Sequence, residues 1–409
     1  MPNTLITPTW VTKDAATFWK NNLKLVGQFD RQYDSQYKDK PKGAKIGYSV
    51  QARLPNRFVV SEGQSAEQQA LLDQVVNISV NHQYHVDMGW SSADQTMSIQ
   101  DTQKRYTRPA GIALANKWDA QAGQEVYKSV YMAIGTPGTR IATNDVWTDG
   151  IAKLQNAGVP QEFVAVIDPK TQSKLLSTNF ALFNPAPQIS KYFRTGQFGA
   201  EALGVDEWYY DQNLPMHTTG SFTSSSPAVN GASQTGSSLI VDGFGTFALK
   251  TGDVFTLDGV NAVNPLSYVD TGDLQQFVLT ADFAGSTSGT MSISPAIITS
   301  GALQTVTASP ANDAAISFLG STGTVSATMT ATKSKQSLIF HSSAFAFVMA
   351  DLQSPLPGAE SKRVSSEQSG ISIRYSEQWN AQTDQTLSRL DTLGGIAVVL
   401  PYFAMRAYS

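Results

Sequence analysis

Hydrophobic and polar residues alternate along a long stretch near the start of the chain. From 76 to 88 the even positions are mainly apolar or aromatic, as at Val76 and Ile78, and the odd positions are polar. This period of two predicts a strand with one buried face, about 40 Å long over 76–88. Residues 46–54 alternate in the same way, and a polar, acidic bend over 61–74 joins the two runs. An isolated two-stranded ribbon is marginal in water. The same chain could cover its apolar side, but a ribbon of this length more naturally reaches a neighbouring subunit, which we expect.

Apolar residues at helical spacing predict two helices on either side of this ribbon. The first covers 12–26 and is capped by Thr12, and a charged connector follows it over 28–45. The second is a long helix within 98–134, with Pro109 in its first turn or at a kink.

Strand and helix signals then alternate. A helix capped by Asn144 or Asp145 precedes a short buried strand over 163–167. Pro169 then opens another helix, which Asp168 caps. This alternation indicates a mixed α/β domain.

The composition changes at Pro215. Of the 122 residues from 216 to 337, 51 are Ser, Thr or Gly, and no arginine occurs between Arg194 and Arg363. Short β-like runs punctuated by Gly and Asp recur there, which predicts a small all-β barrel or sandwich. These runs cover 238–242, 253–257, 276–279 and 291–293. Apolar or strand-like runs return over 339–349, 371–375 and 394–403. The chain therefore leaves one domain, builds a β insertion and comes back.

The overall composition argues against several functional classes. Charged residues are 15% of the chain, below the usual value of about 25%. The net charge is −4, and the densest basic group is mixed with acids, so nucleic-acid binding through clustered cations is not expected. That basic group is Lys38, Lys40, Lys42 and Lys45. Cysteine is absent, which excludes disulfides and thiolate sites. The N-terminus has no secretion-signal pattern and no run suits a membrane helix, so we expect a soluble protein that is not exported.

The four histidines are poor candidates for a metal or catalytic site. His82 and His85 lie three apart on a predicted strand, so they should point to opposite faces. His217 and His341 flank the predicted insertion, and could approach one another where it begins and ends. We expect no catalytic, cofactor-binding or metal-binding residue.

Acidic residues surround an aromatic trio at 208–210. Glu201, Asp206, Glu207 and Asp211 could form a sugar-binding cleft with paired carboxylates, or simply the polar edge of a strand, which we favour. The segment 285–289 has threonine where a serine nucleophile would be needed, and no phosphate-binding loop is present.

Six segments together resemble a known family. They are LKLVGQFDRQY (23–33), GYSVQARLPNR (47–57), YTRPAGIALANKWD (106–119), GVDEWYYDQNLP (204–215), KTGDVFTLDG (250–259) and TLGGIAVVLPY (392–402). Their order and spacing resemble the major capsid (coat) proteins of tailed bacteriophages with the HK97-like fold. The closest resemblance is to the short-tailed-phage (podovirus) branch with an inserted β-barrel domain.

The resemblance implies an α+β chain divided into the family's domains. These are an N-terminal arm (1–44), an extended E-loop (45–95), a P-domain with a spine helix (96–139), an A-domain in two parts (140–214 and 338–390), an inserted β-rich domain (215–337) and a C-terminal P-domain strand (391–409). In the cross-linking variant of the family an E-loop lysine joins a neighbour's asparagine. Here no lysine follows Lys45 until Lys104, so non-covalent contacts are expected.

By the same resemblance, the chain is not an enzyme but a shell protein that assembles in the bacterial host cytoplasm and ends in the virion capsid. Its copies would form pentamers and hexamers around double-stranded DNA without sequence-specific binding. Partners would be a scaffolding protein, a portal protein and, as an additional candidate, a decoration protein. The alternative is an extracellular carbohydrate-binding β-protein, and a hydrolase using Glu201 and Asp211 ranks third.

Overall fold

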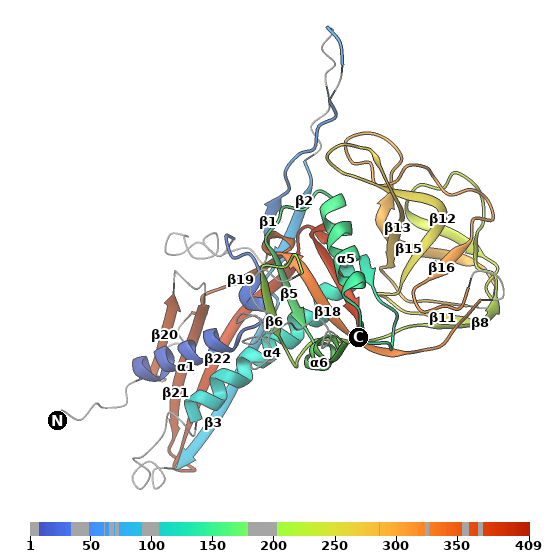
Figure 1. Cartoon of the computed structure of the whole chain (residues 1–409). Helices are drawn as coiled ribbons and strands as arrows, with labels where there is room; N and C mark the ends of the chain where they lie inside the picture. The colour runs from blue at the N-terminus through green and yellow to red at the C-terminus, as the bar shows by residue number, and fades with distance from the viewer. Residues whose placement is uncertain are drawn as a thin grey trace, which may run out of the picture. The chain divides into compact units, whose positions relative to one another are not determined.

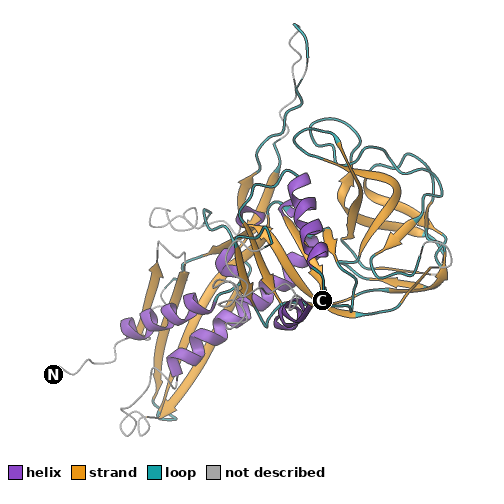
Figure 2. Ribbon diagram, viewed as in Figure 1, coloured by secondary structure: helices purple, strands orange, loops and turns teal. Residues whose placement is uncertain are grey.

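The computed structural model of the chain (Figure 1) describes residues 8–33, 49–60, 62–64, 69, 73–91, 106–178, 203–285, 287–323, 327–353, 360–366 and 371–409. Helices and sheets are both present (Figure 2), so the chain is of the α+β class. The chain forms two compact units. The first comprises Met1–Arg53, Val75–Ala122 and Phe345–Val399, and the second comprises Leu54–Gln74, Gly123–Ala344 and Leu400–Ser409.

The first unit is built on one antiparallel sheet. Its strands are β3 (His82–Ser91), β19 (Phe345–Met349), β20 (Glu360–Ser366), β21 (Ile371–Asn380) and β22 (Gln385–Val398). The long strand β22 organises it, because β22 pairs with β21, β3 and β19 along its length. β20 pairs with the far side of β21.

Two helices belong to this unit, α1 (Pro8–Asn22) and most of α4 (Arg108–Val126). The predicted Thr12 cap is wrong, because α1 begins four residues earlier, at Pro8, and Thr12 is fully buried within it. Proline fits the first helical position, where its missing N–H is not needed. The helix ends at Asn22, whose side-chain amide donates to the Phe18 carbonyl at 2.6 Å.

The long helix α4 has Pro109 in its first turn, as predicted, but it ends before the predicted limit. A 3-10 turn (Tyr127–Ser129) follows Val126, and Met132–Ile134 forms strand β4. All three residues of β4 are buried. The apolar run after Ser129 therefore belongs to a sheet, which helical spacing alone did not indicate.

The predicted ribbon is shorter than expected. β1 (Ser49–Arg53) pairs with β2 (Val75–Ser79) in a two-stranded antiparallel sheet. The prediction of a single strand over 76–88 is wrong. Strand β2 ends at Ser79, and the next strand, β3, pairs with β22 and not with β1. The alternation of less and more exposed side chains nevertheless continues through both strands. Periodicity reports which face is buried, but not which strand is the partner.

The second unit contains a mixed sheet in the order β4-β23-β18-β5-β6, with β7 pairing β18. Its further strands are β5 (Phe163–Ile167), β6 (Glu207–Tyr210), β7 (Met216–Thr218), β18 (Lys333–His341) and β23 (Ala404–Tyr408). Helices α5 (Asn144–Asn156) and α6 (Pro169–Thr178) confirm the helices predicted around β5. Asp168 accepts the Lys170 N–H at 3.1 Å, as a cap should.

Between β7 and β18 the described residues form strands and connections without a helix. The strands are β8 (Ser221–Ser225), β9 (Ala228–Val229), β10 (Gly236–Asp242), β11 (Phe247–Leu249), β12 (Val254–Val263), β13 (Asp270–Leu279), β14 (Phe283–Gly285), β15 (Gly289–Ile297), β16 (Ile316–Phe318) and β17 (Ala327–Met329). They form two sheets, β16-β12-β13-β15-β10-β9 and β14-β11-β8-β17, around a hydrophobic core of their own. We call residues 216–332 the strand-only segment.

Residues 338–390 were expected to form one domain with 140–214, but only part of them does so. Strand β18 does pair with β5, but β19, β20 and β21 belong to the sheet of the first unit. The predicted strand over 394–403 is also divided, because β22 ends at Val398, and Pro401–Phe403 forms a 3-10 turn before β23. Proline cannot donate to a ladder, which explains the interruption at Pro401.

Candidate assembly surfaces

The segment that connects β1 to β2 exposes a run of apolar side chains. Phe58 is 57% exposed, Val59 is 38% exposed and Val60 is 94% exposed. Exposed apolar residues that are contiguous mark contact sites for other molecules. The sequence reasoning missed this run, although three consecutive apolar residues beside an acidic bend were a visible signal.

Local hydrogen bonds hold this segment without a regular ladder. The Leu54 N–H donates to the Gln74 carbonyl at 2.9 Å, and the Asn56 side-chain amide donates to Asp73 at 3.2 Å. Farther along, the Val59 N–H donates to the Gln69 side-chain oxygen at 3.0 Å. We call residues 54–74 the arm segment.

Two neighbouring glycines of β22 let this strand pack closely against β2 and α4 in the first unit. A Cβ at Gly395 would collide with the Ser79 carbonyl oxygen of β2. A Cβ at Gly394 would lie 2.9 Å from the Trp118 ring and 2.8 Å from the Val348 carbonyl oxygen. The glycine pair of the 392–402 segment therefore allows β22 to touch β2 and α4 closely.

Trp118 of α4 is the centre of the packing in this unit. Its ring meets Tyr84 edge-on at 4.9 Å and Phe347 at 5.2 Å between centroids. Its Nε1–H donates to the Thr392 hydroxyl at 3.0 Å. Tyr84 belongs to the predicted apolar face of the ribbon. The apolar face of β3 is therefore covered by helix α4 of the same chain, and not by a neighbouring subunit.

The opposite face of the same sheet carries a row of charged side chains. Register places Arg374, Asp391 and His85 opposite one another on β21, β22 and β3. Asp391 is fully buried; its two carboxylate oxygens lie 2.7 Å from Arg374 Nη2 and 2.6 Å from Arg389 Nε. Two arginines thus compensate one buried carboxylate, as a buried charge requires. This group was not anticipated from the sequence.

The four histidines do not come together at one site. His82 lies on the half-buried face of β3 beside Trp118, and His85 lies on the exposed face, 2.9 Å from Asp87. The expected approach of His217 and His341 is wrong, because β7 pairs His217 with Ser334, seven residues before His341 on β18. Seven residues along a strand correspond to about 23 Å. Among the described residues no group of three or more His, Cys, Asp or Glu could hold a metal ion.

The acidic residues around 208–210 do not line a described sugar cleft. The Trp208 ring packs edge-on against Trp147 at 5.7 Å, and Asp211 is 4% exposed. Glu207 accepts from the Tyr209 hydroxyl at 2.6 Å. Glu201 lies outside the described residues, as does the basic group 38–45. Trp208 and Tyr210 thus pack against the core of the second unit, which removes part of the support for the carbohydrate-binding alternative.

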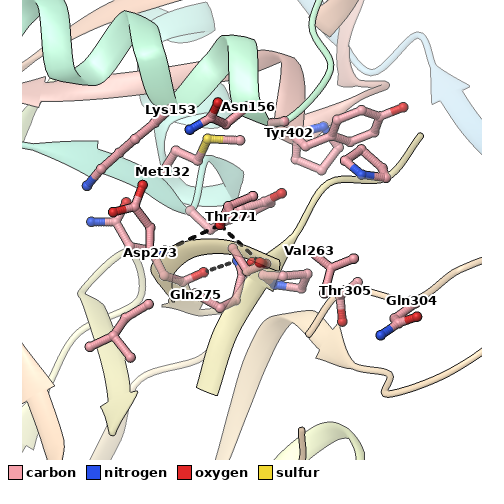
Figure 3. A pocket seen from close by; sticks show the side chains of 18 of the residues that line it. Met132, Lys153, Asn156, Val263, Thr271, Asp273, Gln275, Gln304, Thr305 and Tyr402 are labelled. Atoms are coloured by element: carbon pink, nitrogen blue, oxygen red, sulfur yellow. Dashed lines mark hydrogen bonds between the residues drawn. The ribbon is translucent and has the colours of Figure 1, made fainter. Parts of the chain in front are cut away.

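A cavity of about 160 Å³ lies in the second unit between α5 and the strands β12 and β13 (Figure 3). Lys153 of α5, Asp273 of β13 and Tyr402 are among its lining residues. Tyr131, also at the cavity, has its pKa raised because it is buried, so its hydroxyl stays neutral. Asp273 is the one carboxylate on the described lining, whereas glycoside hydrolysis uses two. The described part of the cavity therefore lacks the acid pair of a hydrolase.

No described helix is long and apolar enough to cross a membrane.

The family model described as "P22 coat protein - gene protein 5" matches residues 44–405. The chain belongs to the P22 coat protein family. Its members' role fixes the function, so the chain is a tailed-phage major capsid protein that forms the head shell. The family has a structural role, and the protein is located in the virion capsid.

Solved structures give weaker similarities. The chain is 14% identical to a Mycobacterium phage Che8 structure, with a TM-score of 0.46 over 93% of this chain and 89% of that one. It is 12% identical to a chain in the capsid of cyanophage P-SCSP1u, with a TM-score of 0.42 over 89% and 84% of the two chains. A Pyrococcus furiosus virus-like particle is 8% identical, with a TM-score of 0.41 and 97% of each chain covered. Curated proteins yield no match. The assignment rests on the family model.

Proposed function

We propose that the chain builds its shell through non-covalent contacts of an HK97-like subunit, in which the arm segment lies over an adjacent copy. The arm belongs to the E-loop of the family scheme, α4 is the spine helix, and the strand-only segment is the inserted domain. The proposed domain limits follow the resemblance, except that 345–399 groups with the spine helix, and 54–74 and 400–409 group with the second unit.

The observation that carries this proposal is the exposure of Phe58, Val59 and Val60 on the arm. Each apolar side chain stabilises a contact by about 25 cal/mol per Å² of buried apolar area, and docking entropy offsets part of this. A single arm contact is then weak, and a closed shell gains stability from many copies of it. Weak single contacts also allow misplaced subunits to leave during assembly.

The shell would enclose double-stranded DNA without reading its sequence. A net charge of −4 and a low charged content suit a wall around packed phosphate, since adhesion would hinder filling. Assembly would take place in the host cytoplasm around a scaffolding protein and meet a portal protein. A decoration protein is an additional candidate partner.

The substitution Val60→Asp tests this use of the arm. A charge at a side chain that is 94% exposed leaves the subunit folded but blocks an apolar contact with another copy. Particles from the expressing cells are counted by electron microscopy, and circular dichroism checks the fold. Gln64→Asp is the matched control, because it places the same charge on an exposed polar residue of the same arm. Shells at the normal yield from the folded Val60→Asp variant contradict the proposal.

A further inference from the structure

Four buried polar side chains meet where the strand-only segment joins the rest of the second unit. They are Tyr127 after α4, His217 on β7, Asp253 in the turn before β12 and Arg406 on β23. Their exposed fractions are 4%, 2%, 1% and 0%, in that order. A buried charge is costly unless hydrogen bonds and opposite charge compensate it. The contacts among these four residues therefore contribute to the stability of the junction.

Asp253 is the acceptor at the centre of the group. One carboxylate oxygen lies 2.9 Å from Nε2 of His217, and the other accepts the backbone N–H groups of Gly220 at 2.9 Å and Lys250 at 2.8 Å. Because an ionised carboxylate only accepts, Nε2 of His217 carries a proton. Nδ1 of the same ring lies 3.3 Å from the Tyr127 hydroxyl. His217 thus bridges the end of the long helix to the turn at 250–253.

Arg406 supplies the opposite charge. Its Nη2 donates to the Gly252 carbonyl, and its guanidinium lies 5.9 Å from the ring centroid of Tyr127 and 5.5 Å from that of Tyr408. In the described structure its Nε and Nη1 have no hydrogen-bond partner. Burial raises the pKa of both tyrosines, which keeps their hydroxyls neutral. The buried group then holds one positive arginine and one negative aspartate.

The backbone of the turn before β12 allows the His217 and Tyr127 rings to lie close to Gly252. Gly252 has a φ of +99°, which disfavours any side chain, and a Cβ there would lie 3.3 Å from both the His217 and the Tyr127 rings. The Asp253 N–H donates to the Lys250 carbonyl at 3.0 Å and closes the turn. This gives a physical role to the start of the KTGDVFTLDG segment.

We propose that Tyr127, His217, Asp253 and Arg406 form a latch that fixes the strand-only segment in the position needed for shell assembly. The strand-only segment has a core of its own, so its folding does not require the latch, whereas its attachment to β23 and to the end of α4 does. The assembly part of this inference rests on the proposed function. The four side chains act as positioning residues.

The substitution Asp253→Asn tests the latch, and Asp282→Asn is its control. Asp282 belongs to the same corner, but it is exposed, and its pKa is lowered to about 2 first by the Thr251 N–H and then by Lys250. Hydrogen exchange is followed by mass spectrometry in peptides from 213–222 and 248–254, and in peptides from the core strands β13 and β15. Asp253→Asn should speed exchange at the junction by about ten-fold while β13 and β15 stay protected. Asp282→Asn should leave exchange in the peptides from 213–222 as in the wild type, because Asp282 bonds Lys250 and Thr251 on the exposed side of the turn.

Shell yield gives the second readout. Asp253→Asn should lower it at an equal folded fraction, and Asp253→Asn with Arg406→Met should partly restore it, because the pair removes both buried charges. If Asp253→Asn fails to fold, Tyr127→Phe, which removes one hydroxyl, should still speed exchange at 213–222. Equal junction exchange in Asp253→Asn and Asp282→Asn overturns the latch. Faster exchange with normal shell yield overturns its role in assembly, while an absence of shells from the wild type would instead overturn the proposed function.

Discussion

At Gly394 and Gly395, strand β22 comes into close contact with three other elements of the first unit. The absence of both side chains lets β22 approach α4, β19 and β2. The sequence shows two glycines in an apolar run, but their meaning depends on partners distant in the chain, Ser79 and Trp118. His217 is a similar case. It was singled out because histidines are rare here, yet its partners Asp253 and Tyr127 follow from folding and not from spacing.

Gly395→Ala should destabilise the subunit by about 1–3 kcal/mol, because its Cβ would overlap a backbone carbonyl that cannot move freely. Gly89→Ala on β3 is the control, since its Cβ would meet nothing within 4 Å. Urea unfolding of the subunit measures both. Equal midpoints for the two variants would show that the close approach of β2 and β22 does not exist.

Elements with one clear local period were predicted well, and those that depend on a partner were not. Strand β5 matches its predicted limits, and α5 and α6 appear where helices were predicted. The predicted cap of α5 is wrong, because Asn144 and Asp145 lie within the helix and Thr143 is its N-cap. The run 76–88 was predicted as one strand, because alternation continues across the break after Ser79. The charged row on β21 and β22 gave no signal, since cross-strand neighbours are set by register.

Arg374→Met should destabilise the sheet of the first unit more than Arg389→Met. Arg374 is 16% exposed and reaches Asp391 with Nε and Nη2, so its loss leaves a buried carboxylate half compensated, at a cost of about 3–5 kcal/mol. Arg389 is 37% exposed, so water can replace much of its interaction, and about 1–2 kcal/mol is expected. Chemical denaturation gives the ranking. A larger loss of stability in Arg389→Met than in Arg374→Met would contradict the role of Arg374 as the main partner of Asp391.

Shortening the arm segment between 61 and 74 should leave a folded subunit that does not close shells. The described residues of the arm contribute no strand to a sheet, so we expect its loss to remove the proposed contacts with other copies and not the core. Circular dichroism and electron microscopy are the two measurements. If the shortened variant unfolds, the arm is part of the core of its own subunit. If it forms normal particles, the assignment of the arm to the E-loop is contradicted.

At the scale of the whole molecule, the family and its function were predicted from six short segments in order. Several of these segments meet in the structure. Asp119 of the helix segment accepts the backbone N–H groups of Lys24 and Val26, at 2.8 and 2.9 Å, from the first segment. Thr392 of the last segment bonds Trp118. Such contacts give several of these segments a structural role. The grouping of domains could not be derived from the sequence, because 345–399 returns to the first unit.

The most direct measurement is a cryo-electron microscopy map of particles formed by the wild-type chain, with the arm segment traced in each subunit. Our account predicts a closed shell in which Phe58 and Val60 are buried against an adjacent copy. A shell in which these side chains face solvent, or lie only on their own subunit, would contradict it.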